Sequence, residues 1–197
     1  MKRRDKEKKC ELYVAKPSFA KDKGKLTGKK RGDAYHKLME YIPMEKAMSE
    51  QEVAQFIQNN TRDFLSDAER DCIKPADISR FFADDIAARM LKSGRIYREY
   101  PIFHRLSDDI MRDILGEFDE KLTERPYVQG IVDMFFIEDD GIVLVDYKTD
   151  SHSDEETLSE DYSFQLKVYE EALKAAFGKP VKEKYIYSFG LGGTVTL

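Results

Sequence analysis

The chain has 197 residues, of which 41% are hydrophobic and 12% aromatic, which is enough for one globular domain with a full core. No apolar run approaches the roughly 18 residues of a membrane helix, and the basic N-terminus lacks the apolar region of a signal peptide. The two cysteines are too few for a disulfide framework or for an iron–sulfur cluster, which takes about four, so we expect a reduced, cytoplasmic protein.

The charge is distributed unevenly along the chain. Residues 1–31 carry 13 Lys and Arg against 4 Asp and Glu, and the remainder carries 20 against 34. The net negative charge of residues 32–197 argues against broad electrostatic binding of nucleic acid. It is compatible with an enzyme whose carboxylates bind a metal ion, or with a domain that receives DNA from a larger assembly. We therefore expect a basic, irregular arm at residues 1–30, either a solvated tail or a DNA-contacting arm, and a single domain at residues 31–197.

The first part of this domain, residues 31–94, is predicted to be mainly helical. One helix starts near Asp33, and a series of helices follows over residues 49–93, with a capping box at Ser66–Glu69 and Pro75 at a first helical turn. An apolar stripe predicts the last of these helices; it comprises Ile78, Phe81, Phe82, Ile86 and Met90.

The second part, residues 95–197, is predicted to hold the sheet core. Residues 95–103 form an expected strand, which Pro101 places at a sheet edge, and a weak helical pattern covers residues 107–120. The polar stretch 149–160 is expected to be a mobile loop beside the functional site that the preceding strands are predicted to carry. The remaining pattern predicts a helix and two strands, at 161–177, 182–190 and 194–197.

Two nearly all-apolar strands form a predicted hairpin over residues 130–150, and three ionisable side chains interrupt them: Asp133, Asp146 and Lys148. Asp140-Gly141 is a strong signal for a two-residue turn. This turn would place Asp133 opposite Lys148. Opposed residues, and residues two apart along a strand, share a face of the sheet. The sequence therefore predicts that the three ionisable side chains cluster on one face.

The same register places Phe135 opposite Asp146 and divides the apolar residues between two faces. The face with the ionisable residues is expected to carry Ile131, Phe135, Ile137, Ile142 and Leu144, and the other face Val132, Met134, Phe136, Val143 and Val145. Helices should then cover both faces. Two carboxylates in such a place repel each other and are costly to desolvate, which a divalent cation such as Mg²⁺ would offset. An ion-paired cluster, in which Lys148 neutralises one aspartate, is the alternative.

Three polar residues outside the hairpin lie on predicted helices. Gln165 and Tyr169 are i, i+4 neighbours on the helix over 161–177, where Tyr169 also fits the apolar stripe and Gln165 lies beside it. His36 lies in the first helix. On local sequence alone, a single helical histidine is better explained as a structural residue than as a metal ligand.

Taken together, these residues resemble the RecB-type nuclease family of the PD-(D/E)XK superfamily, in particular the C-terminal nuclease domains of AddA-type helicase–nuclease subunits. The family pattern runs G-x-x-H, G-x-x-D, D-x-K and Q-x-x-x-Y. This chain has, in the same order, Gly32 to His36, Gly130 to Asp133, Asp146 to Lys148 and Gln165 to Tyr169. The first motif is one residue longer than the family's, and Asp33 follows its glycine where threonine is usual. The resemblance covers about residues 15–197. It implies an α/β, restriction-endonuclease-like core, with a mixed central sheet flanked by helices and an additional N-terminal helical region.

The resemblance implies a metal-dependent deoxyribonuclease. The expected ligands of Mg²⁺, with Mn²⁺ as a substitute, are His36, Asp133, Asp146 and the backbone carbonyl of Tyr147. Asp133, Asp146 and Lys148 are the expected catalytic residues. Lys148 should orient the attacking water, because a lysine acts as a base at pH 7 only if its pKa is lowered.

The resemblance also assigns supporting residues and partners. Gln165 and Tyr169 would support the site and contact the DNA strand, and Glu99 matches a recurrent glutamate that we rank as supporting. The substrate would be single-stranded DNA fed from a duplex end by a helicase motor, which this chain lacks, with an AddB-type partner subunit, during processing of double-strand breaks for recombinational repair. No iron–sulfur cluster is expected.

Three alternatives remain open on the sequence. The chain could be a nuclease fold that has lost activity and binds DNA or another protein of an assembly, although intact Asp133, Asp146 and Lys148 argue against this. It could be a stand-alone exonuclease of the same superfamily. It could also be a purely structural interaction domain with an acidic surface, which would show no metal dependence.

Overall fold

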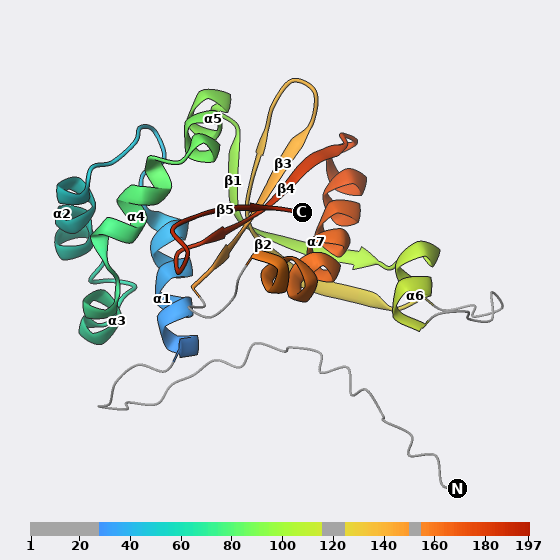
Figure 1. The fold of residues 1–197 in the computed structure, drawn as a ribbon, viewed down its shortest axis with the longest axis horizontal. Helices are drawn as coiled ribbons and strands as arrows, with labels where there is room; N and C mark the ends of the chain where they lie inside the picture. Colours follow the sequence, from blue (N-terminus) through green and yellow to red (C-terminus); the bar gives the residue numbers. More distant parts are fainter. Residues whose placement is uncertain (1–27, 116–124, 150–154) are drawn as a thin grey trace, which may run out of the picture.

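The computed structural model describes residues 28–115, 125–149 and 155–197 (Figure 1). These residues contain a five-stranded sheet in the order β1-β2-β3-β4-β5. The strands are β1 (Ile96–Arg105), β2 (Tyr127–Ile137), β3 (Ile142–Lys148), β4 (Val181–Ser188) and β5 (Gly193–Thr196). β3 and β4 are parallel and the other neighbours antiparallel, which confirms the mixed sheet. β1 lies at the edge, where Pro101 needs no ladder donor.

Helices cover both faces of this sheet (Figure 1). In the described part of the chain they are α1 (Gly28–Tyr41), α2 (Glu50–Asn60), α3 (Asp67–Cys72), α4 (Pro75–Phe82), α5 (Asp85–Ser93), α6 (Asp108–Leu115) and α7 (Glu155–Phe177). α1 to α5 form the expected N-terminal helical region, and α7 connects β3 to β4 on the opposite side. Among the described helices, none is both long and apolar enough to span a membrane.

Each face of the sheet has its own apolar core. On one face, residues of α1, α4 and α5 pack with hairpin side chains that include Met134, Phe136, Val143 and Val145. On the other face, α7 packs with Phe135, Ile137, Ile142 and Leu144. These two sets match the alternation expected for the hairpin, and the expectation that helices cover both faces is confirmed.

Local sequence explains where several helices begin. Ser49 and Ser66 cap α2 and α3, and in each capping box the serine hydroxyl and the glutamate three residues later bond to each other's backbone N–H. Pro75 occupies the first turn of α4, as expected. The apolar stripe predicted as one helix is divided between α4 and α5, because the side chain of Asp84 accepts the backbone N–H of Ile86 and starts a new helix.

The connection between β2 and β3 is longer than the sequence predicts. The last strand pair is Ile137 with Ile142, so the turn consists of the four residues 138–141. The backbone N–H of Glu138 closes it by donating to the carbonyl oxygen of Gly141 at 2.9 Å. The position of the turn is therefore confirmed, but the two-residue length is wrong.

This longer turn changes which residues face each other. Phe135 lies opposite Leu144 and not opposite Asp146. The predicted pairing of Asp133 with Lys148 is wrong for the same reason, since it assumed the same register. Because the register differs by an even number of residues, the paired residues keep their predicted faces.

The alternation of side chains between the two faces of the sheet is interrupted in β1 and β2 at the same position. The ladder skips Glu99 and Asp133, which lie between paired residues on the two strands, and Glu99 has a positive φ of 46°. Val132 and Phe135 both pack on the α7 side, although residues three apart in a regular strand point to opposite faces. The prediction that Val132 shares a face with Met134 is therefore wrong.

Beyond this position, β1 and β2 continue as a two-stranded ribbon towards α6, away from α1 to α5 (Figure 1). One face of the ribbon packs towards α6 and α7 through Ile102 and Val128. Ile131 was expected on the face with the ionisable residues, inside the core. Its side chain is instead 51% exposed.

Several predicted boundaries also shift. α1 begins at Gly28, so residues 28–30 are helical and not part of an irregular arm. α7 begins at Glu155, so the second half of the expected loop over 149–160 is helical. The weak helical pattern is confirmed as α6. Other parts of the predicted segments lie outside the described residues, at 1–27, 116–124 and 150–154; the division into arm and domain stays a prediction.

Candidate active site

His36 and Asp133 are distant in sequence but meet where α1 packs beside the sheet. Nδ1 of His36 lies 3.2 Å from Oδ1 of Asp133, and Oδ2 of Asp133 accepts the backbone N–H of Tyr147 at 2.8 Å. Arg98 of β1 holds the C-terminal end of α1 by donating to the carbonyl oxygen of Met39, in the last turn of the helix, at 3.0 Å and to that of Ile42, just after the helix, at 2.6 Å. The aspartate is thus fixed by the neighbouring strand, and the histidine by the docking of its helix.

Glu99 completes a compact group with these two residues. One ligand atom each from His36, Glu99 and Asp133 lies within 4.8 Å of the others. Burial, together with the nearby charge of Asp133, raises the pKa of Glu99 to about 7. The family resemblance predicted Glu99 only as a supporting residue. Its place in the group follows from the break in β1, which no local sequence signal indicates.

The electrostatics of His36 follow from the same group. Burial alone would lower the pKa of His36, but the hydrogen bond to Asp133 and the charge of that carboxylate raise it to about 9. A proton on the imidazole then offsets part of the negative charge of Asp133 and Glu99. Since metal-binding imidazole is neutral, a cation held by His36 would replace this proton.

Asp146 of β3 is 1% exposed and has a different set of partners. Nζ of Lys148 lies 2.6 Å from its Oδ2, and Nε2 of Gln165 donates to its Oδ1 at 3.0 Å. Burial and the charge of Asp133 raise the pKa of Asp146. Asp146 therefore interacts with Asp133, and its part in the ligand set stays a prediction.

Lys148 is held between an acid and an aromatic ring. Its ammonium group pairs with Asp146 and lies 4.0 Å from the ring centroid of Tyr162 on α7. Burial would lower the pKa of Lys148, but the charge of Asp146 outweighs burial and raises it. Lys148 is therefore a cation at neutral pH and has no free electron pair to act as a base.

α7 supplies the remaining predicted residues. The amide of Gln165 donates to Asp146 and also to the hydroxyl of Tyr169, both at 3.0 Å. Tyr169 packs against Gly130, at the start of the G-x-x-D motif. The four motifs found in the sequence therefore meet at one place in the structure. The roles of these residues in binding and catalysis stay predictions, as does the backbone carbonyl of Tyr147 as a ligand.

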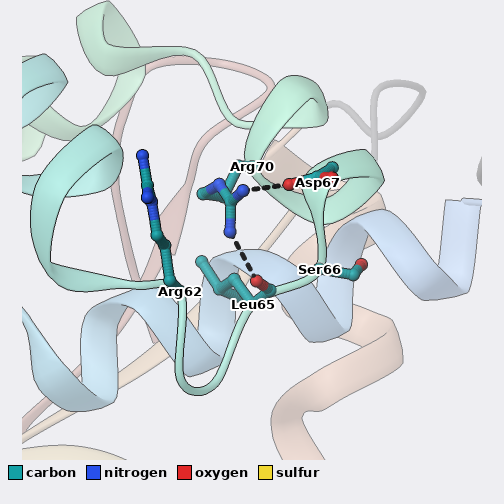
Figure 2. A pocket seen from close by; sticks show the side chains of 5 residues that line it. All are labelled: Arg62, Leu65, Ser66, Asp67 and Arg70. Atoms are coloured by element: carbon teal, nitrogen blue, oxygen red, sulfur yellow. Dashed lines mark hydrogen bonds and ion pairs between the residues drawn. The ribbon is translucent and has the colours of Figure 1, made fainter.

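A separate hollow of about 520 Å³ lies in the helical region (Figure 2). Its lining residues are Arg62, Leu65, Ser66, Asp67 and Arg70. The guanidinium of Arg70 is engaged, because it donates to the carbonyl oxygen of Leu65 at 2.8 Å and pairs with Asp67. None of the five lining residues belongs to the site described above, and we assign this hollow no role.

Comparisons with known proteins give one family and a set of similar proteins. The family model described as PD-(D/E)XK nuclease superfamily matches residues 12–193. Three relatives, each named as a subunit of an ATP-dependent helicase/nuclease, come from Clostridium botulinum strain Langeland, Clostridium kluyveri strain ATCC 8527 and Clostridium botulinum strain Loch Maree. They are 33%, 34% and 34% identical to the chain and cover 94%, 90% and 96% of it. The chain spans only 14–15% of the length of these relatives. The matches confirm the resemblance drawn from the four motifs.

Proposed function

Since the chain belongs to the PD-(D/E)XK nuclease superfamily and is a nuclease by that membership, we propose that it hydrolyses phosphodiester bonds of single-stranded DNA with Mg²⁺ as its cofactor. The observation that supports this most is the gathering of His36, Glu99, Asp133 and Asp146 from one helix and three strands. Lys148 lies beside them as the cation of the D-x-K motif.

The donor set fits a divalent cation. The compact group offers two carboxylates and one imidazole nitrogen within 4.8 Å of one another. Burial, and then the charge of Asp133, raises the pKa of Glu99, and a bound cation would favour the ionised form of both carboxylates. Hard oxygen ligands favour Mg²⁺ or Mn²⁺. We propose that His36, Glu99 and Asp133 hold the metal, with Asp146 and the Tyr147 carbonyl as further ligands.

The residues around the metal then have distinct tasks. A divalent cation held here supplies Lewis-acid polarisation of the phosphodiester and offsets negative charge in the transition state. Lys148, which stays protonated, donates to the attacking water or to a phosphoryl oxygen and so orients them. Gln165 keeps the buried carboxylate of Asp146 in one orientation. Tyr169 accepts from Gln165 and fixes the amide in turn.

The similar proteins are much longer and carry a helicase in their name. We propose that the chain corresponds to the nuclease part of such an assembly, in which a helicase motor delivers single strands from a duplex end and an AddB-type protein is the partner. Cleavage would then serve the processing of double-strand breaks for recombinational repair in the bacterial cytoplasm. Delivery by a motor suits a domain with a net charge of −5, which attracts DNA poorly by itself.

The test is cleavage of an end-labelled single strand and of its duplex, with Mg²⁺, with Mn²⁺ and with EDTA. We expect the single strand to be cut with either metal and to stay intact in EDTA. Asp146→Ala and Asp133→Ala should each abolish cleavage. Calorimetric titration of Mn²⁺ provides a second readout, and Asp133→Ala should weaken this binding.

Asp139→Ala is the matched control, because Asp139 is a fully exposed aspartate on the turn of the same hairpin. We expect this variant to cleave like the wild type. Full cleavage by rigorously purified Asp146→Ala protein would show that the assigned residues do not form the active site.

A further inference from the structure

The ribbon of β1 and β2 presents an exposed face next to the candidate active site. It consists of six side chains, which alternate with the residues packed towards α6 and α7. The register pairs them as Pro101 with Ile131, Phe103 with Gln129 and Arg105 with Tyr127, and all six are exposed. We call these six residues the ribbon face.

Two aromatic side chains dominate the ribbon face. The rings of Phe103 and Tyr127 stack at 4.7 Å between centroids with an interplanar angle of 5°, yet the two residues are 64% and 56% exposed. Ile131, at 51%, extends the apolar area towards the site. Large apolar side chains gathered on one exposed face mark an interaction site more often than a free surface. Flat, solvent-facing rings are the platform on which nucleic-acid bases stack.

The charge of the ribbon face favours a polyanion. Arg105 is the one charged residue among the six, whereas the chain as a whole has 38 Asp and Glu against 33 Lys and Arg. No carboxylate among these six side chains would repel a phosphate backbone. The combination of aromatic rings with an arginine is the composition of surfaces that bind single strands without sequence preference.

The ribbon face is continuous with the compact group of His36, Glu99 and Asp133. Pro101 follows Glu99 by two residues on β1, and Ile131 precedes Asp133 by two on β2. The strands that present the face therefore also carry two of the three residues of the compact group. From Asp133 to Tyr127 the ribbon spans about 20 Å at the usual rise per residue.

We infer that the ribbon face binds single-stranded DNA by stacking bases on Phe103 and Tyr127 and leads the strand into the site at Glu99 and Asp133. This inference rests on the proposed nuclease function and adds how the site takes up its substrate. Stacking requires unpaired bases, because a duplex hides their faces. The ribbon face thus gives a physical reason for a preference for single strands.

The experiment measures binding of a fluorescent oligothymidine of about 12 nucleotides to the full chain in EDTA, where cleavage does not interfere. Phe103→Leu and Tyr127→Leu keep an apolar side chain but remove the ring, and each should raise Kd about tenfold. Phe103→Tyr and Tyr127→Phe keep the ring and should stay within about twofold of the wild type. Melting curves of each variant check that the fold is retained.

Leu191→Ala is the control for Ile131→Ala, because both side chains are 51% exposed in the wild type and Leu191 follows β4 outside the ribbon. Ile131→Ala should weaken binding, and Leu191→Ala should not. A duplex of the same length should compete poorly. Sedimentation of the wild type tests whether a second copy of the chain occupies the face; a dimer lost in Phe103→Leu would overturn the inference.

Failure of the inference is distinguishable from failure of the proposed function. If the wild type cleaves DNA with Mg²⁺ and both leucine variants bind single strands as well as it does, the ribbon face is not the platform, and the nuclease function stands. If binding in EDTA depends on the rings but no cation yields cleavage, the platform stands and the proposed function fails. Absence of any binding by the wild type in EDTA would overturn the inference.

Discussion

The ring of Tyr169 lies against the backbone of Gly130. A β-carbon at position 130 would come within 3.2 Å of Cε1 and 3.5 Å of the hydroxyl oxygen of Tyr169. That hydroxyl accepts from Gln165, whose amide also donates to the buried Asp146. The glycine of one motif therefore sets the position of the tyrosine of another, and the tyrosine anchors the glutamine that holds the aspartate.

We expect Gly130→Ala to lower kcat/KM on single-stranded DNA by about tenfold or more, because its methyl group displaces the Tyr169 ring and loosens the hold of Gln165 on Asp146. The measurement is cleavage at several substrate concentrations with saturating Mg²⁺. Tyr169→Phe, which keeps the ring and removes the hydroxyl acceptor, should lower activity in the same direction. Wild-type activity in Gly130→Ala would show that this contact does not position the site.

Lys148→Met should lower the single-turnover cleavage rate by at least about a hundredfold, since it removes the cation that we propose orients the attacking water and leaves Asp146 without its ion pair. Calorimetric binding of Mn²⁺ should persist in this variant, because Lys148 is not a ligand. Lys174→Met, at an exposed position in the last turn of α7, is the control and should cleave normally. Cleavage by Lys148→Met at the wild-type rate would remove the lysine from the mechanism.

The sequence predicts the hairpin and the faces of its paired residues, because alternation is a local property that survives an even change of register. It also places Asp146 and Lys148 together, since residues two apart in a strand share a face. His36 is different. Nothing local distinguishes it from a structural histidine, and only the family motif order brought it into the site.

The incorrect predictions concern positions where contacts with segments distant in sequence determine the backbone conformation. The two-residue turn is replaced by a longer one in which Gly141 approaches the carbonyl oxygen of Pro180, a contact that depends on how β4 docks. The reversal of faces at Glu99 and Asp133 involves two strands at once, and the positive φ of Glu99 is unusual for a residue with a side chain. That reversal brings Glu99 into the compact group with His36 and Asp133 and exposes Ile131.

Gly141→Ala should destabilise the protein by about 1–3 kcal/mol, because the added β-carbon would lie 2.8 Å from the Pro180 carbonyl oxygen, a backbone atom that cannot rotate away. Urea unfolding in the presence of EDTA measures this difference. Gly193→Ala is the matched control: its added β-carbon meets no atom within 4 Å, so the change in unfolding free energy should stay near zero. Equal stability of Gly141→Ala and wild type would mean that the turn adapts freely.

The stability of the metal-free protein should depend on pH through Glu99. The folded-state pKa of Glu99 is raised to about 7 from an unfolded value of 4.5, chiefly by burial and then by the charge of Asp133. A carboxyl group with a raised folded-state pKa favours folding at pH values below 4.5, and this contribution is lost as the pH rises through 7. Glu99→Gln removes the ionisation and keeps a side chain of similar size.

Glu99→Gln should therefore be more stable than the wild type at about pH 8 in EDTA, and the difference should vanish below about pH 4. Comparing the two proteins at each pH cancels the titration of groups that do not interact with Glu99. With saturating Mn²⁺ at about pH 8 the order of stability should reverse, because the variant lacks one of the proposed ligands of the cation. Glu156→Gln, at an exposed position on α7, is the matched control for the removal of one carboxylate. If the unfolding free energies of Glu99→Gln and the wild type changed in parallel with pH, both the raised pKa of Glu99 and the burial that causes it would be contradicted.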